Sequence, residues 1–312
     1  MTQYTIGVDI SKAHLDAHRL PDDVARQFSN DRRGFADLIK WIGTRSAERI
    51  VYEPTGAFHR DFEEAMTAAD LPLAKVNPLQ ARRFAEARGT RAKTDKVDAA
   101  VLAHMGVALQ PDICAAPSKI GRDLKELQIA RQALIKDQTA AKNRSKSLRL
   151  AMLKKQNKLR LRQIAQNLKA IEDAMLVLIK ADQKTARAFE ILCSIPGIST
   201  LTAATLLTEM PELGSLEQKA VASLAGLAPF SRESGKWKGK RFIGGGRKFL
   251  RDALYMPALV ACRFNADMKV VYQRLKEAGK PSKVAITAVM RKLIILANTL
   301  IKNNRTWVKN NA

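Results

Sequence analysis

The sequence predicts an α/β domain built on a mixed sheet, then a long basic helical segment, and then a mainly α-helical domain. Short apolar runs alternate with helical patterns up to Gln110. No Gly or Pro occurs in the 74 residues between Gly121 and Pro196, as expected of long uninterrupted helices. Beyond that segment, apolar residues recur at helical spacing. We therefore expect domains at residues 1–110, 111–185 and 186–312.

The first domain reads as three strands in a row followed by alternating strands and helices. We expect strands at residues 4–9, 15–19, 25–29, 49–52 and 72–76, and helices at 34–42, 58–69, 78–87 and 94–109. This order predicts a mixed sheet flanked by helices, which is the arrangement of ribonuclease-H-like nucleases.

Four acidic residues stand where such a sheet would bring them together. Asp9 ends the first strand, and Glu53 follows the strand at 49–52. Thr94 is the expected N-cap of a helix in which Asp95 and Asp98 are three residues apart and share one face. Oxygen ligands of this kind suit a pair of Mg²⁺ ions. The alternative is that these acids are caps and surface charges.

The charge of the chain points to a polyanionic partner. The net charge is +24 and the pI is about 10.2, which favours nucleic acid. No apolar run approaches the roughly 20 residues of a membrane span, and the N-terminus enters a strand pattern rather than a signal peptide. We expect a cytoplasmic protein associated with the bacterial nucleoid and no membrane partner. Three cysteines, Cys114, Cys193 and Cys262, suggest neither a disulfide framework nor a zinc site.

A basic loop precedes the third acid. Its residues are Arg82, Arg83, Arg88, Arg91 and Lys93. We expect them to hold phosphates beside the metal site. The alternative is a solvated loop.

The long helical segment carries a coiled-coil pattern and much of the positive charge. Its seam steps by three and four residues through Leu161, Ile164, Leu168, Ile171, Met175 and Leu178. We expect two antiparallel helices that break near Gln156 and Asn157 and pair with a second subunit. Residues 119–169 hold 15 Lys and Arg against 3 Asp and Glu, which favours a nucleic-acid backbone over a merely solvated face. The expected contacts include Lys142, Arg144, Lys146 and Arg149.

Two further segments suggest phosphate contacts. The Pro196–Gly197 turn, between two short apolar helices, indicates a helix-hairpin-helix, with a plain helical corner as the alternative. Residues 224–251 form a basic stretch in which Trp237 and Phe242 could stack on bases. Its expected nucleic-acid contacts, besides Trp237, are Arg232, Lys236, Lys238, Lys240, Arg241, Arg247 and Lys248. Glycines 244–246 precede a helix, so we expect Arg247 to point at an anion.

Together these motifs resemble the DEDD-type insertion-sequence transposases. The resemblance rests on GVDIS, YEPTG, KTDKVDA, SIPGI, LAGLAPFSRESGKWKGKR and GKPSKVAITAVMRKL, which follow in order along nearly the whole chain. That family is a group of bridge-RNA-guided recombinases that join a RuvC-like domain to a transposase domain carrying a serine, and the coiled coil of this chain is the region least covered by the resemblance.

The resemblance implies a set of roles. Asp9, Glu53, Asp95 and Asp98 would be the ligands of two Mg²⁺ ions, for which Mn²⁺ could substitute, and Ser234 would be the nucleophile. The partners would be donor DNA, target DNA and an element-encoded guide RNA. The protein would form a dimer that pairs into a tetramer on DNA.

Two other functions fit parts of the sequence. One is a Mg²⁺-dependent junction nuclease that hydrolyses DNA with water, in which Ser234 is only a turn residue. The other is an architectural nucleic-acid binder, which would gain nothing from four convergent carboxylates. Tyrosine-recombinase chemistry is disfavoured because no histidine lies beyond His104, and HUH chemistry is excluded because no His-x-His motif occurs.

Overall fold

The computed structural model divides the chain into two compact units, residues 1–116 and 117–312, which are described separately. The structure describes residues 4–43, 47–54, 56, 58–90, 94–114, 118–231, 233–235, 237–239 and 241–308.

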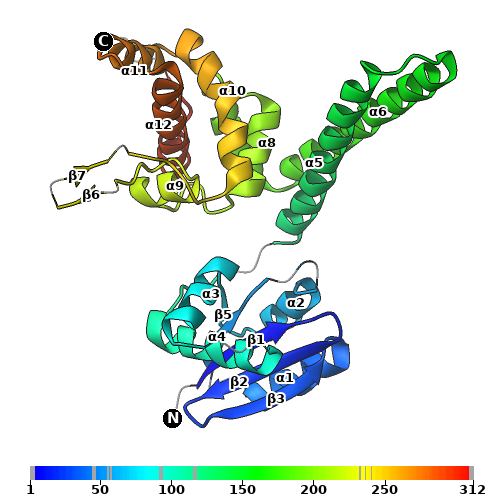
Figure 1. Ribbon diagram of the computed structural model, residues 1–312, viewed down its shortest axis with the longest axis vertical. Helices are drawn as coiled ribbons and strands as arrows, with labels where there is room; N and C mark the ends of the chain where they lie inside the picture. Colours follow the sequence, from blue (N-terminus) through cyan, green and yellow to red (C-terminus); the bar gives the residue numbers. More distant parts are fainter. Residues whose placement is uncertain are drawn as a thin grey trace. The chain divides into compact units, whose positions relative to one another are not determined.

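Unit 1 contains a five-stranded mixed sheet, as the sequence predicts. Its strands are β1 (Tyr4–Ile10), β2 (His14–Leu20), β3 (Val24–Ser29), β4 (Ala47–Tyr52) and β5 (Leu73–Lys75). They lie in the order β3-β2-β1-β4-β5 (Figure 1). The three sequential strands β1, β2 and β3 pair antiparallel, whereas β4 pairs parallel with both β1 and β5. Because β1 and β4 run parallel, their carboxyl ends lie at the same edge of the sheet.

Helices cover both faces of this sheet. They are α1 (Arg32–Ile42), α2 (Arg60–Ala68), α3 (Pro78–Ala87) and α4 (Asp95–Leu109). Alternation along β1 sends Ile6, Val8 and Ile10 into a core shared with α1 and α2. The other face meets α3 and α4, where Val51 of β4 packs with Leu102. This second face carries the candidate site.

Two glycines let α4 lie unusually close to the sheet. A Cβ at Gly7 of β1 would stand 2.1 Å from the carbonyl oxygen of Ala99, and a Cβ at Gly106 would stand 2.5 Å from a methyl of Thr5. Both contacts are too short for any side chain. Because Gly7 meets the first half of α4 and Thr5 meets the second, α4 runs antiparallel to β1. Its N-terminus therefore lies near the carboxyl end of β1.

Unit 2 begins with an antiparallel pair of long helices, α5 (Lys119–Ser145) and α6 (Ala151–Ala181) (Figure 1). The break predicted near Gln156 and Asn157 is wrong, because the chain turns between residues 146 and 150. Asn157 instead lies inside α6 and donates to the Ala141 carbonyl at 3.0 Å and the Ser145 hydroxyl at 2.5 Å. Local polarity resembles a turn signal, but here the partner helix α5 accepts both hydrogen bonds of a buried side-chain NH₂ group. Pairing with a second subunit stays a prediction.

The remaining helices build one core. They are α7 (Gln183–Cys193), α8 (Thr200–Glu209), α9 (Gln218–Leu224), α10 (Lys248–Phe264), α11 (Ala266–Glu277) and α12 (Ser282–Lys302). The Pro196–Gly197 turn between α7 and α8 packs on α10, since a Cβ at Gly197 would lie 2.8 Å from the Pro257 carbonyl oxygen. Buried Ile195 and Ile198 flank that turn. One side of the turn is therefore packed against α10, while Ser199 and Thr200 at the start of α8 are exposed. A phosphate contact at this turn stays a prediction.

Helix α12 is the central helix of this core. Its inward face includes Val289, Leu293 and Ala297, all fully buried. Among the described helices it alone has the length and mean hydropathy, 1.8, of a membrane span, in contrast to the expectation that no apolar run approaches that length. Half of that apolar stretch is buried inside the protein.

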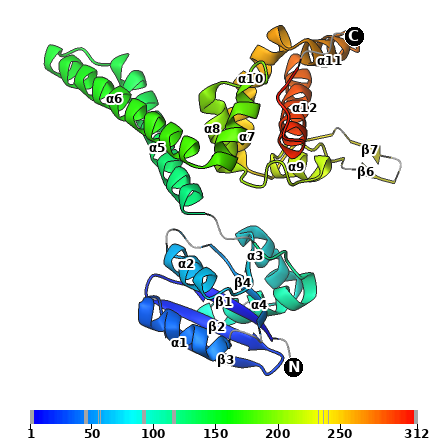
Figure 2. The ribbon, with the colours of Figure 1, turned by 180° about the vertical axis from the view of Figure 1, so that it is seen from behind.

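A short hairpin extends from the helices of unit 2. It consists of β6 (Glu233–Ser234) and β7 (Trp237–Lys238), which pair antiparallel. Phe230 and Phe242 close its base through two backbone hydrogen bonds of 2.9 and 3.1 Å. Both ribbon views show the hairpin reaching beyond α9 (Figures 1 and 2). We call residues 230–242 the arm.

A candidate carboxylate site and an exposed serine arm

Asp9 lies on the face of β1 that α4 covers. It shares this face with Thr5 and Gly7, four and two residues before it, whose contacts with α4 identify the face. Asp9 itself is half-buried. The strand therefore delivers its carboxylate toward the N-terminus of α4.

Asp95 and Asp98 occupy the first turn of α4, as predicted. Thr94 caps the helix by accepting from the Val97 amide at 3.4 Å. Asp95 is exposed and Asp98 is half-buried. Negative side chains are favoured at a helix N-terminus, where free amides carry partial positive charge.

Glu53 follows β4 directly, and the residue before it is firmly anchored. Tyr52 is buried on the opposite sheet face and donates its hydroxyl hydrogen to Glu63 of α2, which also pairs with Lys75 of β5. Burial and the Glu63 carboxylate raise the pKa of Tyr52 well above its usual range, so the hydroxyl keeps its proton. Contacts with α2 and β5 thus anchor the end of β4, which half-buried Glu53 follows directly.

The pKa of Asp9 agrees with this placement of the acids. Its pKa is raised from 3.8 to about 6. Burial is the largest cause, and the rest is repulsion from four carboxylates: Asp95, Asp98, Glu53 and Asp16. The three other predicted acids are therefore the strongest charged neighbours of Asp9.

Asp16 is a site residue that sequence reasoning missed. It lies opposite Asp9 in the β1–β2 register and is 4% exposed. Gln27 of β3 donates to both of its carboxylate oxygens, at 3.1 and 3.2 Å. A small pocket of about 150 Å³ beside it is lined in part by Arg26 and Lys96. The signal was available in the spacing, because a tight hairpin between the two strands pairs these residues.

The carboxylates fit a hard divalent cation by their chemistry. All are oxygen donors, and their mutual repulsion at Asp9 is what a bound cation would relieve. In the described part of the chain, however, no three metal-ligating side chains stand close enough to bind one ion together. The arrangement is a cluster of carboxylates rather than a closed coordination shell.

Ser234 lies in β6, opposite Trp237 of β7, next to Gly235 at φ 55°. Its side chain is exposed, and a Cβ at Gly235 would meet nothing within 4 Å. No other described residue hydrogen-bonds its hydroxyl. The serine is accessible to a large substrate, and the described residues supply it with no general base.

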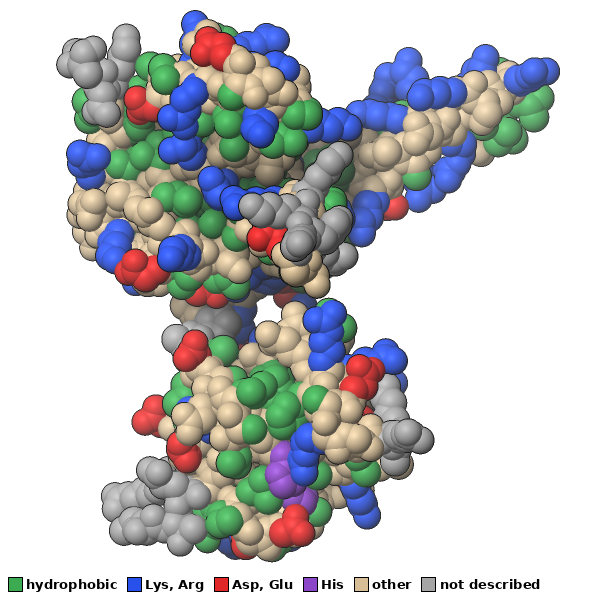
Figure 3. All heavy atoms as spheres, turned by 60° about the vertical axis from the view of Figure 1, so that its left-hand side comes forward, with side chains coloured by type: hydrophobic (Ala, Val, Ile, Leu, Met, Phe, Trp, Pro, Cys, Tyr) green, Lys and Arg blue, Asp and Glu red, His purple; other side chains and the backbone are tan. Residues whose placement is uncertain are grey.

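The predicted nucleic-acid contacts have varied surroundings. Exposed Lys142, Arg144, Lys146 and Arg149 lie around the tip of the α5–α6 hairpin, and Lys and Arg side chains line that hairpin in Figure 3. Arg82, Arg83 and Arg88 are exposed on or just after α3, with Arg82 paired to Glu86 at 3.3 Å. Arg241 and Lys248 are exposed, and Lys248 pairs with Asp252. Outside the described residues lie Arg91, Lys93, Arg232, Lys236 and Lys240, as do the side chains of Trp237 and Lys238.

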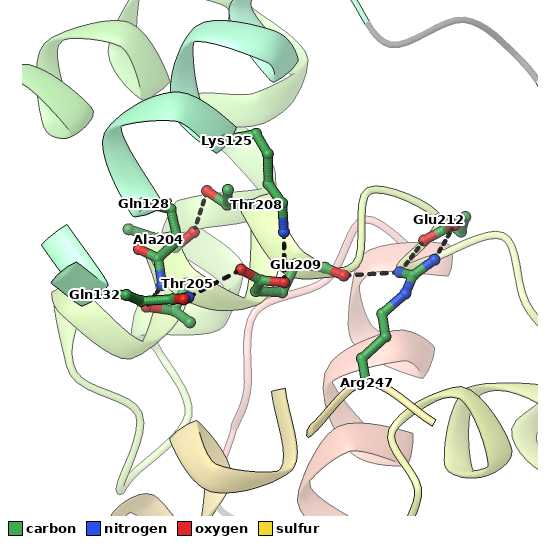
Figure 4. Close-up of polar contacts among 9 residues, drawn as sticks. All are labelled: Lys125, Gln128, Gln132, Ala204, Thr205, Thr208, Glu209, Glu212 and Arg247. Carbon is green, nitrogen blue, oxygen red and sulfur yellow. Dashed lines mark hydrogen bonds and ion pairs between the residues drawn. The ribbon is translucent and has the colours of Figure 1, made fainter. Parts of the chain in front are cut away.

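Arg247 departs from its predicted role. Its guanidinium makes two hydrogen bonds to the Glu212 carboxylate, at 2.7 and 2.8 Å, and one to the Glu209 carbonyl at 2.7 Å (Figure 4). Three hydrogen bonds from the two terminal nitrogens therefore go to groups of the protein itself, so the guanidinium pairs with an internal carboxylate instead of pointing outward at a phosphate. The partner, Glu212, is 35 residues away in the sequence, so local sequence patterns do not reveal this pairing.

Family models match both parts of the chain. A model described as "Transposase", of the DEDD type and named for IS110, matches residues 6–151. A second, described as "Transposase IS116/IS110/IS902 family", matches residues 189–273. The two matches cover the carboxylate cluster and the arm.

Two curated relatives match nearly the whole length of the chain, and a third matches part of it. The chain is 31% identical over 324 residues to a pilin gene-inverting protein of Moraxella lacunata, and 30% identical to that of Moraxella bovis, with 99% of each chain covered. It is 30% identical over 127 residues to an uncharacterized 42 kDa protein of insertion element IS900 from Mycobacterium paratuberculosis, covering 39% of this chain and 31% of that one. The chain belongs to the IS110-type insertion-sequence transposase family, whose members are enzymes that recombine DNA.

Proposed function

We propose that this transposase cuts and rejoins DNA through a phosphoserine intermediate formed on Ser234, using divalent metal held by Asp9, Glu53, Asp95 and Asp98. The observation that carries the metal site is geometric: Asp9 lies on the face of β1 that α4 covers, near the first turn of α4 with Asp95 and Asp98, and Glu53 follows the parallel strand β4. The raised pKa of Asp9, caused by burial and by repulsion from these carboxylates, agrees with that arrangement. The β3-β2-β1-β4-β5 order and the acids at the ends of β1 and β4 support a RuvC-like domain. The accessible position of Ser234 supports its role as nucleophile.

The reaction is a transesterification in which bonds balance. Ser234 Oγ bonds to phosphorus as the bond from phosphorus to the 3′ oxygen breaks, and the serine proton ends on the released 3′ hydroxyl. A 3′ hydroxyl of the other DNA then reverses the attack and regenerates the serine. Mg²⁺ or Mn²⁺, when bound, would stabilise the charge that develops on the phosphoryl oxygens. The residues of this chain orient the phosphate and supply the nucleophile.

We further propose that an element-encoded RNA chooses the donor and target sequences, and that two subunits or more assemble on the DNA. The positive charge along α5–α6 supports a long nucleic-acid partner. Sequence choice by base pairing would leave the protein to read backbone shape.

Covalent capture tests the mechanism. The protein is incubated with the element RNA, Mg²⁺ and labelled donor and target DNA, and a denaturing gel is examined for a protein–DNA adduct. We expect an adduct that Ser234→Ala and Asp9→Ala abolish and that needs the RNA. Ser231→Ala, which changes another exposed serine of the arm, is the matched control and should keep the adduct.

Two results would change this assignment. Cleaved DNA without an adduct, still made by Ser234→Ala, would mean a hydrolytic nuclease.

Mixing Asp9→Ala with Ser234→Ala chains tests whether acids and serine from different subunits can act on one phosphate. Restored adduct formation supports that sharing, and heterodimers that form no adduct exclude it.

A further inference from the structure

The arm is rooted at one point where the chain leaves it for α10. The Arg247 amide donates to the Leu224 carbonyl at 2.7 Å. Gly246, at φ 60°, packs so closely that a Cβ there would lie 2.3 Å from the Gly226 nitrogen. Arg251 donates to the Gly245 carbonyl at 2.9 Å. Both ends of the segment that carries the arm are thus drawn together.

The guanidinium of Arg247 ties this root to the end of α8. It bonds Glu212 through two parallel contacts and caps the Glu209 carbonyl, one of the free carbonyls at the C-terminus of α8 (Figure 4). Burial alone would raise the pKa of Glu212, but the Arg247 hydrogen bonds hold it below its usual range. Such bidentate, charge-assisted pairs fix orientation as well as distance.

Glu209 extends the same network to α5. Glu209 is 6% exposed. Its carboxylate accepts hydrogen bonds from Lys125 at 2.8 Å and from Gln132 at 3.3 Å. Figure 4 shows its backbone facing Arg247 while its side chain faces α5. Glu209 of α8 therefore contacts both Arg247, at the root of the arm, and helix α5.

We propose that Arg247 is a positioning residue that, through Glu212 and Glu209, holds the arm at a set orientation for attack by Ser234. It acts on the serine through the arm and does not bind the nucleic-acid backbone. This inference rests on the proposed role of Ser234.

Three variants and a control separate positioning from phosphate binding. Arg247→Gln removes the charge and the fork, whereas Arg247→Lys keeps the charge but loses the fork. Glu212→Gln keeps the size of the side chain that accepts from Arg247 but removes its negative charge. Losing a negative charge cannot weaken DNA binding by repulsion, so a slower reaction in this variant points to positioning. Lys248→Gln, at the neighbouring exposed base, is the control for a phosphate contact. For each we measure the rate of adduct formation at saturating DNA, DNA affinity across salt concentrations, and hydrogen exchange of the amides in residues 229–246.

Positioning predicts a common pattern. All three variants should form adduct at least about 10-fold more slowly, with DNA affinity within about 2-fold and the salt slope unchanged, and arm amides should exchange faster. Lys248→Gln should instead weaken DNA binding and reduce the salt slope by about 1. A wild-type rate in Glu212→Gln, or a loss of affinity and salt slope in Arg247→Gln, overturns the proposal.

Failure of the proposed chemistry is distinguishable from failure of this inference. If the wild-type protein forms no adduct, the serine mechanism fails, and hydrogen exchange still decides the positioning role. Faster exchange of the arm in Arg247→Gln and Glu212→Gln then supports it, and unchanged exchange rejects it.

Discussion

Asp16 of β2 lies directly across the antiparallel register from Asp9 of β1, so two carboxylates share one face of the sheet under α4. Asp16 is almost fully buried and is held by Gln27, and its charge contributes to the raised pKa of Asp9. A fifth carboxylate therefore lies beside the four predicted acids and is placed to act on the proposed metal site through its charge.

Replacing Asp16 with Asn should weaken metal binding while leaving the fold intact. Asn keeps an oxygen acceptor for Gln27 but removes a charge beside Asp9, and residues that support metal ligands typically change affinity by about 10-fold or more. Titration calorimetry with Mn²⁺ measures this. Asp37→Asn, an exposed acid on α1, is the control, and equal affinities in the two variants would contradict a role for Asp16.

Stability of the metal-free protein should fall as pH rises from about 4 to about 6. The folded pKa of Asp9, about 6, lies above its ordinary value of 3.8, so the folded state binds the proton more tightly in this window. Asp9→Asn should flatten this slope and stabilise the protein at pH 7.5 by about 1 kcal/mol, a value discounted for the partial exposure of the group.

Urea unfolding in EDTA, followed through Trp41 of unit 1, measures this slope. A background with Trp237 and Trp307 changed to Phe isolates the signal, because the chain has three Trp residues. An unchanged slope in Asp9→Asn would show that another group controls the window.

Gly7→Ala should disrupt both stability and metal binding. The new Cβ would lie 2.1 Å from the Ala99 carbonyl oxygen. Because this contact is with backbone rather than with a flexible side chain, only a shift of α4 could relieve it. We expect a loss of roughly 3 kcal/mol and weaker Mn²⁺ binding, since α4 carries Asp95 and Asp98. Gly244→Ala, whose nearest contact would be 3.4 Å, controls for the change of residue type, and equal effects would argue against close packing of α4 as the cause.

The tip of the α5–α6 hairpin should contribute to subunit association. Leu150, Met152 and Leu159 are 65%, 63% and 53% exposed in an otherwise basic region. Changing all three to Gln should shift the mass measured by light scattering toward the monomer. Val177→Gln, near the far end of α6 and 67% exposed, is the matched control. An unchanged mass in the triple variant would remove the tip from the interface.

The candidate site could be predicted from sequence to the extent that its signals are local. Asp9 and Glu53 end apolar runs, and Thr94 caps the helix that holds Asp95, so strand alternation and capping were enough to place them. The mixed sheet followed from the order of these elements, because short connections and the need to bury both faces leave few arrangements.

What the sequence by itself determined was therefore the set of elements in unit 1 and the acids at their ends. The tertiary structure alone decided which residues meet: the Arg247–Glu212 pair is 35 residues apart, Asn157 is buried by a helix rather than set in a turn, and Gly7 owes its role to Ala99. The physical reason is that side-chain pairing and close packing depend on distance in space, which periodicity and local propensity do not encode.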